Sequence, residues 1–149
     1  MRQTTILRRA LDADGVVRVA GAHDALSAVL AERHGFDALW ASGFGICAVQ
    51  AMPDASILTM TELLAAASAM SQASRLPVIA DCDTGFGGVN NVVRMVQAYE
   101  RAGIAGVCIE DKEFPKRNSF LAGHDLADVD EFAPRCTRRK TRRLILTSS

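Results

Sequence analysis

Residues 76–85 read LPVIADCDTG and carry more information about the fold than any other stretch of the chain. The run 76–80 is short and apolar, as expected for a strand buried on both faces. Asp81 and Asp83 follow at i, i+2 spacing, which directs both side chains the same way from extended backbone, and Gly85 opens a glycine-rich turn. A buried strand ending in acidic residues is typical of the carboxyl edge of a parallel sheet, where the chemistry of α/β proteins collects.

Similar apolar runs alternate with helical patterns on both sides of this stretch. We expect strands over residues 16–20, 38–41, 76–80 and 106–109, and helices over 25–34, 61–74 and 89–102. Alternation at this spacing predicts parallel strands joined by right-handed crossovers. A doubly wound sheet and a (β/α)8 barrel share this pattern, and four βα units would make half of a barrel.

The composition limits the class of protein. The chain has 149 residues, enough for one domain with a core, and is 49% hydrophobic but only 5% aromatic. No apolar run reaches the length of a membrane span, so we expect no membrane association and a cytoplasmic location. The few scattered aromatic residues disfavour a nucleic-acid partner. The four cysteines are widely spaced and are expected to be reduced, mostly as core residues.

The formal net charge of zero hides an asymmetry along the chain. Six of the 17 Lys and Arg residues fall within 135–143, whereas all 17 Asp and Glu residues precede residue 134. Residues 1–133 therefore carry eleven basic against 17 acidic residues, a formal charge of −6. One interpretation is a basic tail that binds nucleic acid or an acidic surface.

Acidic residues follow two neighbouring predicted strands. Asp81 and Asp83 end one, and Glu110 and Asp111 end the next. Single aspartates in such places usually cap a turn. Several carboxylates crowded at adjacent strand ends repel one another unless a cation joins them, which favours a Mg²⁺ site, with Mn²⁺ as the alternative.

Two further segments have a structural and a functional interpretation. The segment Lys116–Ser119 is either a solvated surface loop or a mobile lid that brings cations and amide donors onto an anionic substrate. Ser42 and Gly43, at another strand end, either form an ordinary turn or offer backbone N–H groups to a carboxylate or enolate oxygen.

Six motifs, in this order along the chain, resemble phosphoenolpyruvate mutase of the isocitrate lyase/phosphoenolpyruvate mutase superfamily. They are GAHDALS (21–27), WASG (40–43), PDAS (53–56), DCDTGFG (81–87), GVCIEDK (106–112) and FPKRNSF (114–120). The resemblance covers residues 16–133. It implies a (β/α)8 TIM-type barrel, here truncated to about its first four βα units, that uses Mg²⁺ to interconvert phosphoenolpyruvate and phosphonopyruvate in phosphonate biosynthesis. It also implies a small anionic substrate and a homo-oligomer.

The same resemblance assigns roles to residues of this chain. It implies Asp81, Asp83 and Glu110 around the metal, with Asp83 the best candidate for direct coordination; Trp40, Ser42, Gly43 and Phe44 around the pyruvyl carboxylate and the enolate oxygen; and Asp54, Lys116, Asn118 and Ser119 as catalytic residues. Asp54 would lie beside the migrating phosphoryl group. Lys116, Asn118 and Ser119 would belong to a gating loop, with Asn118 contacting that group.

The gating loop separates the relatives of this family. Lyases of the superfamily carry a catalytic cysteine in a Lys-Arg-Cys-Gly-His loop, whereas this chain reads KRNS at residues 116–119. The loop therefore disfavours C–C cleavage. Phosphonopyruvate hydrolase, with a threonine-containing loop, is the nearer alternative, and Asn118 with Ser119 favours the mutase.

After residue 133 the resemblance stops. A family member would continue with four more βα units, which supply a phosphoryl-binding arginine and a histidine. We therefore expect residues 1–133 to be the N-terminal half of a mutase-like barrel and 134–149 to be a basic, non-family tail produced by a frameshift. Such a half barrel would be poorly folded or dimeric, with little activity alone. The alternative is an inactive half barrel that serves as an interaction or basic binding module.

Overall fold

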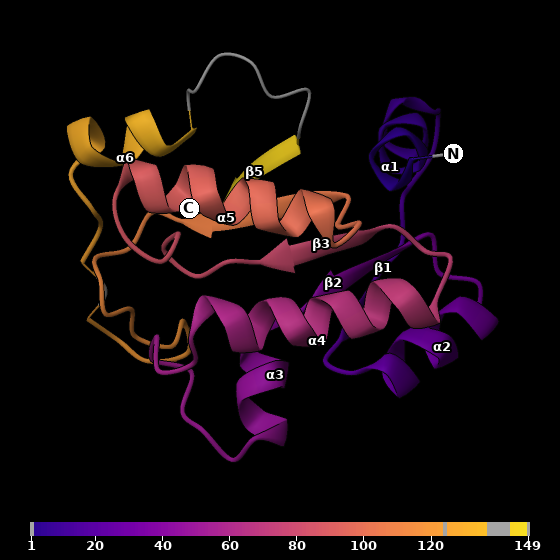
Figure 1. The fold of residues 1–149 in the computed structure, drawn as a ribbon, viewed down its shortest axis with the longest axis horizontal. Helices are drawn as coiled ribbons and strands as arrows, with labels where there is room; N and C mark the ends of the chain where they lie inside the picture. The colour runs from indigo at the N-terminus through magenta and orange to yellow at the C-terminus, as the bar shows by residue number, and fades with distance from the viewer. Residues whose placement is uncertain (1, 124, 137–143, 149) are drawn as a thin grey trace.

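The protein has a parallel sheet covered on one face by helices (Figure 1). The structure is a computed structural model and describes residues 2–123, 125–136 and 144–148. Its strands are β1 (Val19–Ala22), β2 (Ala38–Ala41), β3 (Val78–Asp81), β4 (Gly106–Glu110) and β5 (Leu144–Ser148). Its helices are α1 (Gln3–Asp12), α2 (Ala25–Arg33), α3 (Gly43–Val49), α4 (Met60–Ala73), α5 (Val89–Arg101) and α6 (Val129–Cys136).

The strands lie side by side in the order in which they occur in the chain, β1-β2-β3-β4-β5, and every neighbouring pair is parallel. Helices α2, α4 and α5 connect successive strands, so the first four strands form the predicted βα units. Parallel pairing brings all carboxyl ends to one edge of the sheet. The predicted α/β fold of successive parallel βα units is thereby confirmed.

The face of the sheet toward α4 and α5 carries the main hydrophobic core. Leu39, Val78 and Val107 are buried there, together with Met70 of α4 and Met95 of α5. Figure 1 shows α4 and α5 lying along this face. Because side chains alternate along a strand, the residues between these core positions must point to the opposite face.

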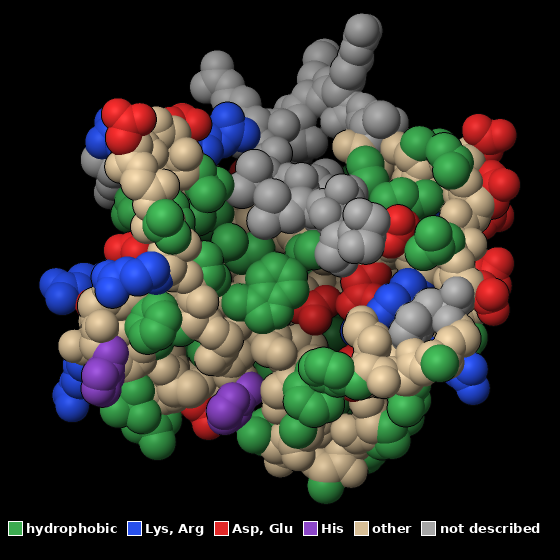
Figure 2. Space-filling view, turned by 180° about the vertical axis from the view of Figure 1, so that it is seen from behind, with side chains coloured by type: hydrophobic (Ala, Val, Ile, Leu, Met, Phe, Trp, Pro, Cys, Tyr) green, Lys and Arg blue, Asp and Glu red, His purple; other side chains and the backbone are tan. Residues whose placement is uncertain are grey.

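That opposite face, the inner face of the half barrel, holds a smaller apolar cluster and the acidic strand ends. Leu7 of α1 packs there against Ile79 of β3, with Trp40 of β2 partly buried beside them. Asp81 lies two positions after Ile79, and Glu110 lies one position after the core residue Ile109 of β4. Both acidic side chains therefore point to the inner face. Seen from this side, acidic side chains gather near the middle of the molecule beside a basic one (Figure 2).

Several elements differ from the sequence predictions. The strand predicted over 16–20 begins three residues later, at Val19, whereas the strand at 38–41 has the predicted bounds. Helices α1, α3 and α6 and strand β5 were not predicted. Helix α6 runs across the boundary that we predict at residue 133, and residues 137–143 and 149 of the predicted tail lie outside the described residues.

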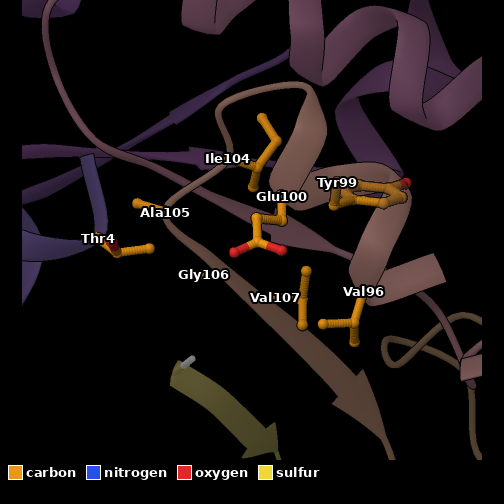
Figure 3. Close-up of a pocket in the computed structure, with 8 residues that line it drawn as sticks. All are labelled: Thr4, Val96, Tyr99, Glu100, Ile104, Ala105, Gly106 and Val107. Carbon is orange, nitrogen blue, oxygen red and sulfur yellow. The ribbon is translucent and has the colours of Figure 1, made fainter. Parts of the chain in front are cut away.

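A small hollow lies near the amino end of β4, at the opposite end of that strand from the acidic residues (Figure 3). Its lining comes from α1, α5 and β4, with Thr4, Tyr99 and Val107 among the residues. Its volume of about 20 Å³ accommodates about one water molecule, so it is no substrate site. Among the described residues, none of the helices is long and apolar enough to cross a membrane.

Candidate functional site

The ammonium group of Lys116 lies among carboxylates from three different segments. Its Nζ is 2.6 Å from Oδ1 of Asp83, 3.1 Å from Oδ1 of Asp54 and 3.3 Å from Oε1 of Glu110. The Lys116 side chain is only 2% exposed. We call Asp54, Asp81, Asp83 and Glu110 the acid cluster. The structure thus brings Asp54 together with the three acidic residues that the sequence placed at or near strand ends.

The fold explains why these side chains meet. Glu110 is the last residue of β4, and Asp83 lies just beyond β3, where its backbone adopts a left-handed conformation with φ +49°. The Glu110 N–H donates to the Asp83 carbonyl oxygen at 2.8 Å, which joins the two strand ends. Lys116 reaches the cluster from the loop after β4, and its N–H donates to Ser56 Oγ at 3.2 Å. Ser56 was not among the predicted site residues.

Asp81 is held by backbone groups instead of by a lysine. Its Oδ2 accepts from the Gly43 N–H and its Oδ1 from the Asp83 N–H, both at 3.2 Å. Burial, reinforced by the charges of Asp83 and Glu110, raises the pKa of Asp81 to about 6, although the charge of Lys116 acts in the opposite direction. Asp81 is therefore mostly ionised at neutral pH, and its ionised form lowers the stability of the folded protein.

Gly43 has to be a glycine for this contact to exist. A Cβ atom at this position would lie 2.8 Å from Oδ2 of Asp81, closer than van der Waals contact allows. Ser42 caps α3, because its Oγ accepts from the Gly45 N–H at 3.1 Å. The Gly43 N–H, which we predict to bind a carboxylate or enolate oxygen, donates in this structure to the Asp81 carboxylate.

The cluster keeps an excess of negative charge. Lys112 also contacts it, with Nζ 2.7 Å from Oε2 of Glu110. Four carboxylates against the two ammonium groups of Lys112 and Lys116 leave a formal charge of −2. Burial acts to lower the pKa of Lys116, but the carboxylates of Asp81, Asp83 and Glu110 outweigh it and raise that pKa. Lys116 is accordingly a permanent cation.

The donor set suits a divalent cation, although Lys116 lies within it. In the part of the chain that the structure describes, no three Asp, Glu, His or Cys side chains are arranged as ligands of one metal ion. The fit rests on chemistry: the cluster offers hard carboxylate oxygens and carries a formal charge of −2. Among the described ion pairs, neither Lys112 nor Lys116 contacts the carboxylate of Asp81.

The loop after β4 covers the acid cluster, and we call residues 114–123 the lid. Asn118 Nδ2 donates to Oδ2 of Asp54 at 3.1 Å, and Asn118 Oδ1 accepts from the Phe120 N–H at 2.9 Å. The rings of Phe120 and Phe44 meet edge to face with their centroids 6.1 Å apart. The lid therefore touches both the cluster and the start of α3.

The predicted site residues fall into two groups. One group converges directly: the predicted metal-binding residues together with Asp54, Lys116 and Asn118. Ser119 is instead joined to the cluster through Lys112, whose Nζ donates to Ser119 Oγ at 2.6 Å. Phe44 is 51% exposed and contacts the lid, and Trp40 is half-buried on the inner face. Sequence reasoning missed the part played by Lys112. The sequence did contain an indication of it: Lys112 lies two residues after Glu110, and in extended backbone such residues have side chains on the same side.

Comparison with known proteins identifies relatives of several activities. The family model for phosphoenolpyruvate phosphomutase matches residues 7–145. The crystal structure of phosphoenolpyruvate phosphomutase from Streptomyces platensis subsp. rosaceus superposes with a TM-score of 0.92 at 53% identity, covering 97% of this chain and 52% of that one. Phosphonopyruvate hydrolase in complex with oxalate and Mg²⁺ gives 0.87 at 36% identity, covering 99% and 52%. The 2,3-dimethylmalate lyase of Eubacterium barkeri is 41% identical over 132 residues, 88% of this chain and 46% of the lyase.

These similarities agree on the family and differ on the reaction. A mutase, a hydrolase and a lyase all match, and the chain spans about half the length of each. Overall identity therefore does not select one chemistry. The chain belongs to the phosphoenolpyruvate phosphomutase family of the isocitrate lyase/phosphoenolpyruvate mutase superfamily.

Proposed function

We propose that this chain carries one half of the active site of an isomerase that interconverts phosphoenolpyruvate and phosphonopyruvate. In this reaction the phosphoryl group leaves the enolate oxygen and joins the methylene carbon of the same pyruvyl unit. One P–O bond breaks and one P–C bond forms, so neither water nor a redox partner is consumed. The substrate is a small anion, and the product is the starting compound for phosphonate biosynthesis.

The observation that carries this proposal is the hydrogen bond from Asn118 of the lid to Asp54 of the acid cluster. It places the amide of a lid residue at the point where the lid meets the cluster. An amide and an ammonium group can hold a phosphoryl group by hydrogen bonds and charge while it moves. The superfamily lyases have their cysteine in this part of the loop, so the residue type favours phosphoryl transfer over C–C cleavage.

Lid closure serves this chemistry by excluding water. A phosphoryl group in transit is intercepted by water when the site stays open, and the product is then orthophosphate. The side chain of Lys116, a lid residue, is already buried, and the ring of Phe120 contacts that of Phe44. We propose that Trp40, Ser42, Gly43 and Phe44 border the pyruvyl carboxylate and the enolate oxygen, and that Ser119 acts with the lid.

The acid cluster is proposed to hold Mg²⁺, or Mn²⁺, through Asp81, Asp83 and Glu110. When bound, the ion would offset the negative charge of the enolate. Asp81 is a better candidate for a direct ligand than Asp83, because Asp83 Oδ1 is 2.6 Å from the Lys116 ammonium group. Asp83 and Glu110 would then act through metal-bound water, as Mg²⁺ commonly prefers.

The reaction is tested by ³¹P NMR of phosphonopyruvate incubated with the purified chain and MgCl₂. Appearance of phosphoenolpyruvate supports the proposal. Orthophosphate with stoichiometric pyruvate instead assigns the hydrolase reaction, and cleavage of 2,3-dimethylmalate would assign a lyase. We expect turnover to be far slower than that of a full-length relative, because the chain spans about half of that length.

Binding is tested separately from turnover, by calorimetric titration of oxalate in the presence and absence of MgCl₂. Oxalate resembles the pyruvyl enolate, and a related hydrolase has been crystallised with oxalate and Mg²⁺. We expect binding only with Mg²⁺, and its loss in Asp83→Ala and in Asp81→Ala. An exposed acid remote from the cluster gives the control, Asp14→Ala, which should bind as the unaltered chain does. Metal-independent binding would contradict the assignment.

A further inference from the structure

The two oxygens of Glu110 are shared between two lysines. Oε1 is 3.3 Å from Nζ of Lys116, and Oε2 is 2.7 Å from Nζ of Lys112. Lys116 belongs to the lid itself. Lys112 precedes the lid by two residues, and its side chain is 14% exposed, far less than a solvated surface lysine would be. Burial at this level indicates that the Lys112 ammonium group has a defined place.

Lys112 also contacts the lid. Its Nζ donates to Ser119 Oγ at 2.6 Å and to the carbonyl oxygen of Arg117 at 3.4 Å. One ammonium group thus joins a carboxylate of the acid cluster to two residues of the lid. Hydrogen bonds from a charged donor are about twice as strong as neutral ones, so this junction is stronger than an ordinary loop contact.

The backbone around Lys112 is fixed by pairing with residues 125–127. The Ala127 N–H donates to the Asp111 carbonyl at 2.8 Å, and the Glu113 N–H donates to the Asp125 carbonyl at 3.1 Å. Lys112 itself forms an antiparallel bridge with Leu126. The residues on both sides of Lys112 are therefore paired, and its side chain extends from this paired segment to the lid.

We propose that Lys112 is a positioning residue that fastens Ser119 of the lid to Glu110, so that closure of the lid depends on the acid cluster. Lys116 and Asn118 anchor the first part of the lid through Asp54 and Asp83. The segment from Ser119 onward is held to the cluster by Lys112. The inference rests on the proposed function only in taking residues 114–123 as the lid of the site.

The test is hydrogen exchange, read at the amides of Phe120 and Leu121 in the 149-residue chain. These N–H groups donate to Asn118 and are protected only while this part of the lid is ordered. We expect Lys112→Met to speed their exchange about tenfold, the effect of losing a charged hydrogen bond. Ser119→Ala should give a comparable increase, and the double variant no more than either single one, because both remove the same contact. Lys112→Arg should retain most of the protection.

Amides of α5 provide the internal reference, since a merely structural role of Lys112 would speed their exchange as well. Faster exchange in α5 by the same factor would overturn the proposal, and so would lid rates within twofold of the unaltered chain. If Lys112→Met does not fold, Ser119→Ala alone decides, and unchanged exchange at Phe120 then refutes the linkage. The measurement uses no substrate, so it can succeed or fail independently of the mutase reaction.

Discussion

At the scale of single residues, Asp81 shows how burial and charge oppose each other in the site. Its pKa of about 6, against an ordinary value near 3.8, is due first to burial. The native protein therefore binds this proton more tightly than the unfolded chain does. The resulting penalty on stability is full above pH 6, fades as the pH falls from 6 to 4, and is absent below that.

Asp81→Asn removes this titration while keeping an oxygen that can accept from the Gly43 N–H. We expect the variant to be more stable than the unaltered chain at pH 7.5, by about 2 kcal/mol after allowance for partial exposure, and equal to it at pH 4. Urea unfolding at half-unit pH intervals measures the difference. A difference that does not change with pH would show that the ionisation of Asp81 carries no such penalty.

Lys116 presents the opposite case, because it neutralises charge that the fold has already buried. Lys116→Met would leave the carboxylates of Asp54 and Asp83 without their cation, and we expect a loss of about 3 to 5 kcal/mol in the free energy of unfolding. Arg94→Met, at an exposed position of α5, is the control and should change stability by less than about 0.5 kcal/mol. Both values come from urea unfolding at pH 7.

In Lys116→Met, Mg²⁺ should restore part of the lost stability, because a divalent ion supplies the missing charge to the same carboxylates. The midpoint of thermal unfolding, measured with MgCl₂ and with KCl at equal ionic strength, detects this effect. An identical response in the two salts would contradict the assignment of the acid cluster as a divalent-cation site.

At the scale of elements, the junction between α3 and β3 depends on a missing side chain. Gly43→Ala would drive a Cβ atom against Oδ2 of Asp81, so we expect a cost of about 1 to 3 kcal/mol and weaker binding of oxalate with Mg²⁺. Gly21→Ala in β1 is the matched control, because nothing lies within 4 Å of its added Cβ. Equal stability of the two variants would mean that α3 shifts freely relative to β3.

The elements predicted from the sequence are those with clear periodicity, and the missed ones break a local rule. β2 and β4 are apolar runs next to glycine or polar turns, and α4 and α5 have regular apolar spacing. In contrast, α3 contains two glycines, which have low helix propensity, and α6 contains Pro134. The sequence also indicated which residues gather at the strand ends. It could not place the Lys116 ammonium group at the centre of the cluster, because that depends on the path of a loop.

At the scale of the whole molecule, the sheet formed by the described residues has two open edges. Within the described residues β1 pairs only with β2, and β5 only with β4. Beside β1 lies a groove of about 490 Å³ lined by residues of β1 and α2. Leu30 of α2 lines this groove and is 45% exposed, and Leu26, about one turn earlier in α2, is 67% exposed. An apolar surface next to an unpaired parallel strand is a site for association.

We expect the chain to self-associate through this edge, with a sedimentation coefficient that rises with concentration. Leu26→Lys combined with Leu30→Lys should shift the protein toward monomer, because burying two ammonium groups in the contact is costly. Ile57→Lys, which also replaces an exposed apolar residue, should leave association unchanged. Analytical ultracentrifugation over a hundredfold concentration range tests this expectation, and equal behaviour of the two variants would refute it.

The boundary at residue 133 belongs to the same scale and stays a prediction. Helix α6 crosses it, and Arg135 donates to the carbonyl oxygen of Thr84 at 3.0 Å, next to Asp83. We propose that residues 134–149 arise from a shifted reading frame. The nucleotide sequence decides this: a neighbouring frame that encodes further βα units supports the proposal, and the absence of one ends it.

Trp40 gives the inner face an optical signal of its own. It is the only tryptophan in the chain and lies on β2, partly buried beside Leu7 and Ile79. Its emission therefore reports the polarity of this one region without any label. A ligand, a partner chain or loss of α1 would change the access of water to this inner face. Greater access shifts the emission of Trp40 to the red, and lesser access shifts it to the blue.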